Sequence, residues 1–71
     1  MITDAKSFGK AIRQRRKDLG YTQSFLADFS GLSVSFISDL ENGNSTAALG
    51  KAIFLANLLG LDCILKPRSQ A

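Results

Sequence analysis

The fold of this chain is decided by residues 22–43, which read TQSFLADFSGLSVSFISDLENG. The stretch contains two short apolar periods, and each of them places three side chains on one face of a helix. These side chains are Phe25, Leu26 and Phe29 within residues 23–30, and Phe36, Ile37 and Leu40 within residues 34–41. Two short helices that both carry an apolar face predict one shared core.

Residues with specific backbone preferences mark the ends of these two helices. Thr22 and Ser33 stand immediately before them, where a hydroxyl oxygen can accept from the first free backbone amides. Gly31 can adopt the positive φ that ends a helix, and Ala27 is small enough to let the second helix cross closely. Two helices at roughly 90–120°, joined by a turn of about 3–4 residues that often contains glycine, form a helix-turn-helix.

A larger set of residues falls at the spacing of a known protein family. The set consists of Thr22-Gln23, Leu26-Ala27, Gly31, Ile37-Ser38 and Glu41-x-Gly43, with Ile12-Arg13 and Arg16 upstream, and Thr46-Ala47-x-Leu49-Gly50-Lys51 and Leu59-Gly60-Leu61-Asp62 downstream. On these residues, over about residues 8–66, the chain resembles the phage-repressor-like (Xre/Cro/lambda repressor) helix-turn-helix family, and within it the HipB-type antitoxins. The resemblance implies an all-α fold, a compact lambda repressor-like bundle of four to five helices.

The length and composition of the chain limit its class. Its 71 residues predict a single domain with a thin core, for which oligomerisation is a common supplement. No apolar run is long enough to cross a membrane and the N-terminus lacks the pattern of a signal peptide, so we expect a cytoplasmic protein with no membrane contact. With one cysteine and no histidine, no metal or other cofactor is expected, and Cys63 is predicted to serve in packing. Residues 1–66 are expected to form the domain and residues 67–71 a flexible tail.

The net charge of +3 is unevenly distributed along the chain. Residues 21–50 contain no cation and three acids, Asp28, Asp39 and Glu41. Most of the cations lie in residues 1–20, namely Lys6, Lys10, Arg13, Arg15, Arg16 and Lys17, against Asp4 and Asp18. Attraction to phosphate would therefore come from the flanks of the motif and from helix amides. The basic N-terminal helix can be a solvated face or a direct phosphate contact, and the sequence leaves both open.

Two arginines compete for one partly buried place on this first helix. The helix is predicted to begin after a cap at Thr3 or Asp4 and to end at Leu19, with Gly20 as the stop. Its predicted apolar arc consists of Phe8, Ala11, Ile12 and Leu19. Arg15 falls inside the arc and Arg16 at its edge, so at least one guanidinium must reach solvent or a partner. The helical wheel favours Arg15 as the buried residue, whereas the resemblance favours Arg16 in an ion pair with Glu41. We expect the Arg16–Glu41 pair.

The exposed side of the second motif helix is the predicted DNA-reading surface. Its residues are Val34, Ser35, Ser38 and Asp39, with the capping Ser33 beside them. Serine can donate to or accept from any base, valine can contact a thymine methyl, and aspartate can accept from a cytosine amino group. Alternatively, the serines only cap and solubilise the helix. None of these side chains is the bidentate Arg, Gln or Asn of strong base recognition, so specificity is expected to be low or partly carried by DNA shape.

The resemblance assigns roles within this predicted DNA site. It places Val34, Ser35 and Asp39 over base edges and Gln23 and Asn42 on phosphates. The predicted DNA-binding set also includes Thr22.

The last helix is expected to carry a dimer interface, because it is apolar nearly all round. It is predicted to run from a cap at Ser45 or Thr46 to Leu59, with Gly60 beyond its end. Its predicted core stripe is Leu49, Ala52, Ile53 and Ala56. Residues 61–66 alternate like a strand ended by Pro67, and we expect this strand to pair with its copy in a twofold homodimer. The expected interface residues are Phe54, Leu55, Leu58, Leu61, Cys63, Ile64 and Leu65.

Several functions fit these features to different degrees. The leading hypothesis is a sequence-specific DNA-binding repressor that binds a double-stranded operator with an inverted repeat. The resemblance further implies an antitoxin that autoregulates a toxin–antitoxin operon and holds a HipA-type serine/threonine kinase toxin. Alternatives are a stand-alone phage-type repressor, or a protein-interaction module that sequesters a toxin without reading DNA. No catalytic residues are expected, because the sequence offers neither histidine nor a phosphate-cradling glycine loop.

Overall fold

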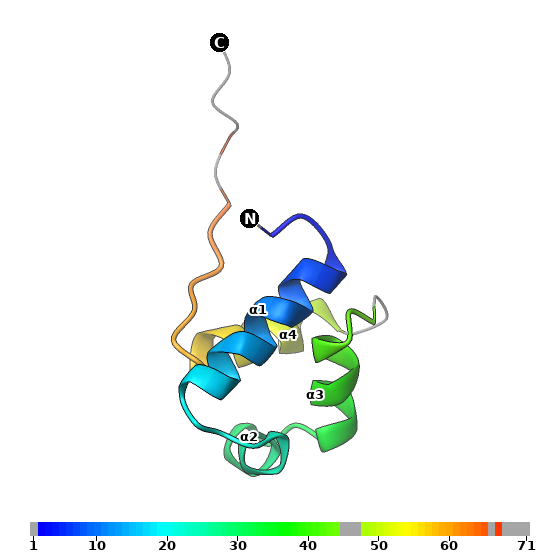
Figure 1. Ribbon diagram of the computed structural model, residues 1–71. Helices are drawn as coiled ribbons and strands as arrows, with labels where there is room; N and C mark the ends of the chain where they lie inside the picture. Colours follow the sequence, from blue (N-terminus) through cyan, green and yellow to red (C-terminus); the bar gives the residue numbers. More distant parts are fainter. Residues whose placement is uncertain (1, 45–47, 66, 68–71) are drawn as a thin grey trace.

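The computed structural model describes residues 2–44, 48–65 and 67, and within these residues the chain is all-α. Its elements are α1 (Ala5–Asp18), α2 (Gln23–Ser30), α3 (Val34–Glu41) and α4 (Leu49–Leu58). In Figure 1, α1 crosses in front of α4, while α2 and α3 form the lower and right-hand parts of the bundle. The expected helical bundle with a helix-turn-helix is confirmed. No helix in the described part of the chain is long and apolar enough to cross a membrane.

Side-chain caps begin the first three helices. Of the two predicted caps of α1, Asp4 is the one used: its carboxylate accepts from the backbone N–H of Ser7 at 2.8 Å, and the Ser7 hydroxyl accepts from the Asp4 N–H at 3.1 Å. The hydrogen bond from the Ser7 backbone N–H lowers the pKa of Asp4, with a smaller contribution from the Ser7 side chain. Thr22 and Ser33 cap α2 and α3 as predicted, each accepting a backbone N–H at 3.0 Å. The ends of the motif helices are thus fixed locally.

The core lies where all four helices meet. Five of its large side chains are less than 2% exposed: Ile12, Leu26, Ile37, Leu55 and Leu59. Ala27, Ala52 and Ala56 are also buried, and their small side chains allow neighbouring helices to approach closely. Burying a large aliphatic side chain contributes about 1.5–3 kcal/mol, so the core depends on few residues.

Three predicted core residues of the first two helices are exposed. Phe25 and Phe29 are 48% and 58% exposed, and Leu19, which caps the end of α1, is 36% exposed. The side of α2 that packs inward consists of Leu26 and Ala27, because a helix of two turns against α3 buries a narrow arc. Phe25 instead stacks on its helix neighbours, with its ring centroid 6.0 Å from that of Phe29.

The orientation of α4 differs from the predicted one. Its buried residues are Ala52, Leu55 and Ala56, with Leu59 at its C-cap. The predicted core residue Leu49 is 72% exposed, whereas Leu55, expected in the dimer interface, is fully buried within its own chain. In a helix with apolar residues on every side, no polar face indicates which side faces inward. The predicted caps Ser45 and Thr46 lie outside the described residues; the N-cap of α4 is Ala48, which makes no side-chain cap.

The expected strand at residues 61–66 is wrong. Residues 61–65 have no regular secondary structure, and residue 66 lies outside the described part of the chain. A strand needs a second strand to satisfy its backbone N–H and C=O groups, and no other described segment of this chain offers one. Cys63 is exposed rather than packed. Of the predicted tail, residues 67–71, only Pro67 is described.

Gly9 is the point of closest approach between α1 and α3. A Cβ atom at this position would overlap the carbonyl oxygen of Leu40 and lie 2.9 Å from that of Glu41. Both neighbours are backbone atoms, which cannot rotate away as a side chain can. The crossing of α1 over the end of α3 therefore requires glycine at this position.

We predict opposite effects from alanine at the two helical glycines, Gly9 and Gly50. Gly9→Ala should lower the free energy of unfolding by about 1–3 kcal/mol, because α1 must move off α3. Gly50→Ala should raise it by about 0.4–1 kcal/mol, because nothing lies within 4 Å of the added Cβ and alanine favours the helix. Urea denaturation followed by circular dichroism measures both. A Gly9→Ala protein as stable as Gly50→Ala would contradict the close crossing.

Candidate nucleic-acid interface

The outward side of α3 forms a polar surface that we call the reading face, made of Val34, Ser35, Ser38 and Asp39. Ser35 and Asp39 are exposed, Val34 is 44% exposed, and Ser38 is half-buried at the edge. The opposite side of α3 packs into the core. The capping hydroxyl of Ser33 sits at the start of the same helix. The four predicted reading residues thus share one accessible strip, with Ser38 less accessible than the sequence suggested.

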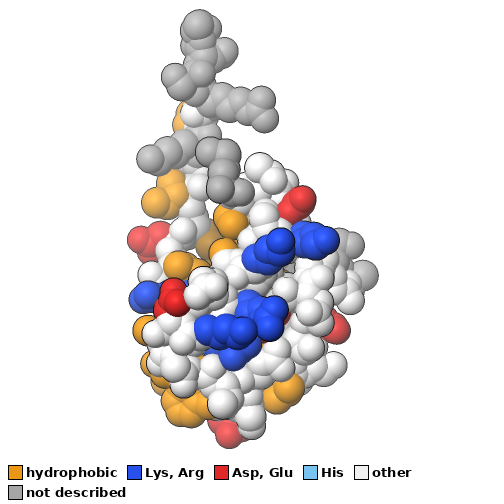
Figure 2. All heavy atoms as spheres, viewed as in Figure 1, with side chains coloured by type: hydrophobic (Ala, Val, Ile, Leu, Met, Phe, Trp, Pro, Cys, Tyr) orange, Lys and Arg blue, Asp and Glu red, His pale blue; other side chains and the backbone are white. Residues whose placement is uncertain are grey.

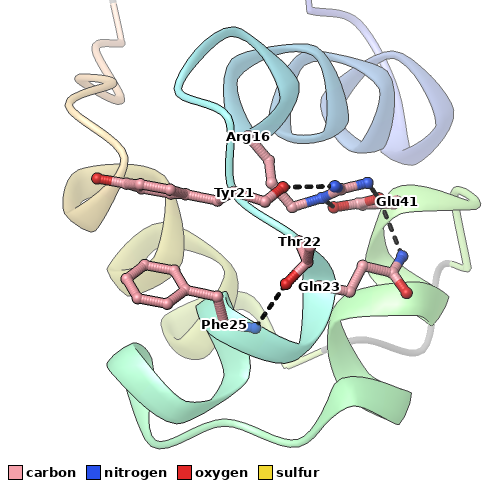
Figure 3. Close-up of polar contacts among 6 residues, drawn as sticks. All are labelled: Arg16, Tyr21, Thr22, Gln23, Phe25 and Glu41. Atoms are coloured by element: carbon pink, nitrogen blue, oxygen red, sulfur yellow. Dashed lines mark hydrogen bonds and ion pairs between the residues drawn. The ribbon is translucent and has the colours of Figure 1, made fainter.

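The N-terminus of α2 lies beside the end of α3 and is joined to it by Gln23. The half-buried Gln23 side chain donates from Nε2 to Oε1 of Glu41 at 3.1 Å (Figure 3). A carboxylate can only accept hydrogen bonds, so the amide nitrogen of Gln23, not its oxygen, must face Glu41. Within the described residues the second N–H of Nε2 makes no hydrogen bond.

The Arg16–Glu41 ion pair expected from the resemblance is present and buried. Arg16 donates from Nε to Oε2 of Glu41 at 2.7 Å and from Nη2 to Oε1 at 2.9 Å, a bidentate arrangement. Its Nη1 donates to the carbonyl oxygen of Tyr21 at 2.9 Å. The two charged side chains are 11% and 2% exposed. The hydrogen bond to Glu41 raises the pKa of Arg16, and burial opposes that effect.

Arg15, the alternative from the helical wheel, has another role. Its Nε donates at 2.7 Å to the carbonyl oxygen of Leu59, at the C-terminal end of α4. A cation at this position satisfies a carbonyl that has no partner within the helix and faces the negative end of the helix dipole. Arg15 is therefore half-buried where α1 meets α4, whereas Arg16 forms the ion pair with Glu41 of the helix-turn-helix.

The turn after α3 packs against the N-terminal part of α1. Asn42, a predicted phosphate contact, is exposed at the C-cap of α3. Gly43 follows with a φ of 81°, and a Cβ on it would lie 2.8 Å from the Cα of Lys6. Figure 2 shows Lys and Arg side chains gathered over α1 on this side of the molecule. The cations that α2 and α3 lack are therefore carried by the adjacent helix.

The predicted dimer residues do not form one continuous exposed face. Phe54 is 46% exposed and Leu58 is half-buried. Leu61 packs against the core, whereas Ile64 and Leu65 are 66% and 100% exposed in the segment after α4. The predicted dimer residues, which also include the buried Leu55, are therefore divided between the core and the exposed surface.

Two features of the site were missed in the sequence. Tyr21 accepts the third hydrogen bond of Arg16 through its backbone, which no side-chain pattern could indicate. Its ring also packs on Phe25, with centroids 4.9 Å apart, and continues through Phe29 as an aromatic row along α2. The i, i+4 spacing of these three residues was a usable signal. Among the described residues there is no group of three or more His, Cys, Asp or Glu side chains that could hold a metal ion.

Comparison with known proteins gives concordant results. A family model described as helix-turn-helix matches residues 12–64. The competence pilus inhibition repressor of Acinetobacter baylyi is 61% identical over 36 residues, which cover 51% of this chain and 33% of that protein, so the match spans about a third of that relative. An uncharacterized HTH-type transcriptional regulator of Sinorhizobium fredii, y4mF, is 38% identical over 67 residues, covering 93% of this chain and 88% of that protein.

The structural comparison points the same way. HipB, in the solved HipB–O4 20mer complex and in the HipA–HipB–O2–O3 complex, is similar with a TM-score of 0.85. The identity is 26%, and the match covers 97% of both chains in each case.

We predict that the buried pair is required for folding. Glu41→Gln should cost about 3–5 kcal/mol, because it leaves the Arg16 charge buried and uncompensated. A domain of this size has about 5 kcal/mol of stability in total, so the variant should be mostly unfolded. Thermal melting by circular dichroism measures the loss.

Two variants control for this result. The exposed Asp39→Asn removes an acid from the same helix and should change the free energy of unfolding by at most about 0.5 kcal/mol. The double replacement of Arg16 by Met and Glu41 by Leu should be more stable than Glu41→Gln, since no charge is left unpaired. A Glu41→Gln protein that melts within a few degrees of the wild type would show the pair to be minor.

Proposed function

The chain belongs to the helix-turn-helix family of transcriptional regulators, and from this we propose that it is a sequence-specific DNA-binding repressor. One observation carries the proposal: the side chain of Gln23, at the start of α2, is hydrogen-bonded to Glu41 at the end of α3, the helix that bears the exposed reading face. This arrangement offers one contact for a phosphate and a neighbouring strip for base edges. Phosphate contacts fix the register of the protein on the duplex, and base contacts supply the sequence preference.

We further propose that the protein is a HipB-like antitoxin that represses its own operon. The likeness to HipB in complexes that contain O2–O3 and HipA supports an operator and a HipA-type serine/threonine kinase as partners. The similarity to a competence pilus inhibition repressor favours the second candidate, a repressor that acts without a toxin. An interaction module that sequesters a toxin without reading DNA is the third. Co-purification with the product of an adjacent kinase-like gene would support the antitoxin role, and failure to bind it would support the stand-alone repressor.

The proposed operator complex contains a twofold dimer and acts in the cytoplasm. We assign the DNA-binding unit to residues 1–66. The exposed apolar side chains Phe54, Ile64 and Leu65 supply surface that a second copy could cover. A twofold axis would present two reading faces to an inverted repeat with half-sites roughly 34–36 Å apart.

We predict different effects from changes at Gln23 and on the reading face. Gln23→Ala should weaken binding to operator and to random duplex by similar factors, because a phosphate contact carries no sequence information. Val34→Ala and Ser35→Ala should change the ratio of the two affinities, by up to about 1–3 kcal/mol for a specific contact. The measurement is a titration of duplexes selected by the wild-type protein from a random pool, against an unselected duplex. Equal operator-to-random ratios in all three variants would contradict these roles.

We also predict that the surface at the end of the chain supports the dimer. Deleting all residues after Gly60, or replacing Phe54 by Ser, should weaken the association measured by sedimentation equilibrium. Phe29→Ser is the matched control, since Phe29 is similarly exposed but lies on α2. If both truncation and Phe54→Ser leave the dimer as tight as in the full chain, the interface lies elsewhere.

A further inference from the structure

One side of α1 carries a row of four cations, which we call the basic stripe. It consists of Lys6, Lys10, Arg13 and Lys17. Their spacing of four, three and four residues places them within an arc of about 60° on the helix. All four side chains are exposed. Within the described residues none of them forms an ion pair; Asp4, whose carboxylate caps the helix at Ser7, interacts electrostatically with Lys6 and Lys10 without pairing with either.

The contacts of α1 show on which side of the helix the stripe lies. Gly9 and Arg16 face α3, through the close backbone approach and the ion pair with Glu41. Arg15 faces α4 through its bond to Leu59. At 100° per residue, the centre of the stripe lies about 80° around the helix from the side of Gly9 and Arg16. Arg15 lies in the opposite direction around the helix, so the stripe and Arg15 flank the side that faces α3. The stripe therefore occupies the part of the outer surface that borders α3.

Both ends of the stripe adjoin the predicted phosphate contacts. At one end, the backbone of Lys6 lies against Gly43, the residue after Asn42. At the other end, the carbonyl oxygen of Lys17 accepts from the N–H of Gly20, in the turn that leads to the N-cap of α2 and to Gln23. The stripe thus runs from the turn after α3 to the turn before α2, the two turns next to the predicted phosphate contacts.

Charge complementarity selects a polyanion as the partner of this surface. We propose that the basic stripe binds the phosphate backbone of the duplex whose bases face α3, an inference that rests on the proposed function. The stripe is about 16 Å long at 1.5 Å per residue, which is long enough to contact several phosphates of a duplex. The motif itself offers no cation, since residues 21–50 contain only the acids Asp28, Asp39 and Glu41.

An acidic protein surface fits the stripe less well than DNA. Protein interfaces place aromatic and other apolar side chains at their centre and are depleted in lysine. The arc of the stripe contains three lysines and one arginine and no apolar side chain. Such a surface supplies charge without packing, which is what sequence-independent binding to phosphates requires.

The test is the salt dependence of DNA binding by a variant with Gln at all four positions of the stripe. Each lost phosphate contact lowers the slope of log K against log salt by about 0.9, so the variant should lose about 2–4 from the wild-type slope. Operator and random duplex should weaken by similar factors, and their ratio should stay at the wild-type value. The matched control replaces Lys6, Lys10 and Lys17 by Arg, which keeps the charge and should keep the slope. Melting curves establish that both variants are folded.

The outcomes separate this inference from the proposed function. A variant with an unchanged slope and an intact preference for selected duplexes overturns the inference and leaves the repressor standing; its stripe would then face a protein. If the Gln variant has a reduced slope but even the wild-type protein prefers no duplex, the stripe is supported as a DNA contact and sequence-specific repression is overturned. An Arg-substituted control that loses as much slope as the Gln variant also overturns the inference, because charge would not be the cause.

Discussion

The structure depends on the buried carboxylate of Glu41 and the three hydrogen bonds that it accepts. Two come from Arg16 on α1 and one from Gln23 on α2, while Glu41 itself ends α3. Removing two charges from water costs several kcal/mol per ion, and only good geometry with further hydrogen bonds offsets that cost. The described residues contain no buried side-chain nitrogen or oxygen without a partner, so every buried polar atom at this site is hydrogen-bonded. Because an apolar core could be equally stable, the gain from the pair is a fixed arrangement of three helices.

That arrangement sets the distance between the two kinds of DNA contact that we propose. The reading face lies on α3, and the Gln23 amide at the start of α2 is bonded to the Glu41 carboxylate of that same helix. A rotation of α2 against α3 would stretch the hydrogen bond from Gln23 to Glu41. This buried interaction therefore fixes the position of the proposed phosphate contact relative to the reading face. The close crossing at Gly9 holds α1, with its cations, against the C-terminal end of α3.

Much of this could be predicted from the sequence, and the rest failed for identifiable reasons. The caps Thr22 and Ser33 and the turn at Gly31 are local features, which short-range hydrogen bonding and backbone sterics determine. The Arg16–Glu41 pair is a long-range contact, and here the helical wheel pointed to Arg15 while family resemblance pointed to the correct residue. The orientation of α4 and the exposure of Phe25 and Phe29 depend on how neighbouring helices pack, and apolar residues on every side of a helix leave that undetermined. The strand predicted at residues 61–66 rests on alternation alone, and no other segment within the described residues offers a second strand to pair with it.

The separation of charge has a consequence for specificity in the proposed complex. A row of cations beside an acidic reading face gives attraction that is independent of sequence, while Asp39 repels phosphate and gains nothing from most bases. Only a cytosine amino group offers Asp39 a donor; at other base pairs its carboxylate loses water without a replacement, at a cost of about 1–3 kcal/mol or more for a charged group. Discrimination at that position therefore comes from the penalty at wrong sites rather than from a strong bond at the right one. A reading face without bidentate side chains can in this way still select a sequence, provided that the neighbouring helix supplies the attraction.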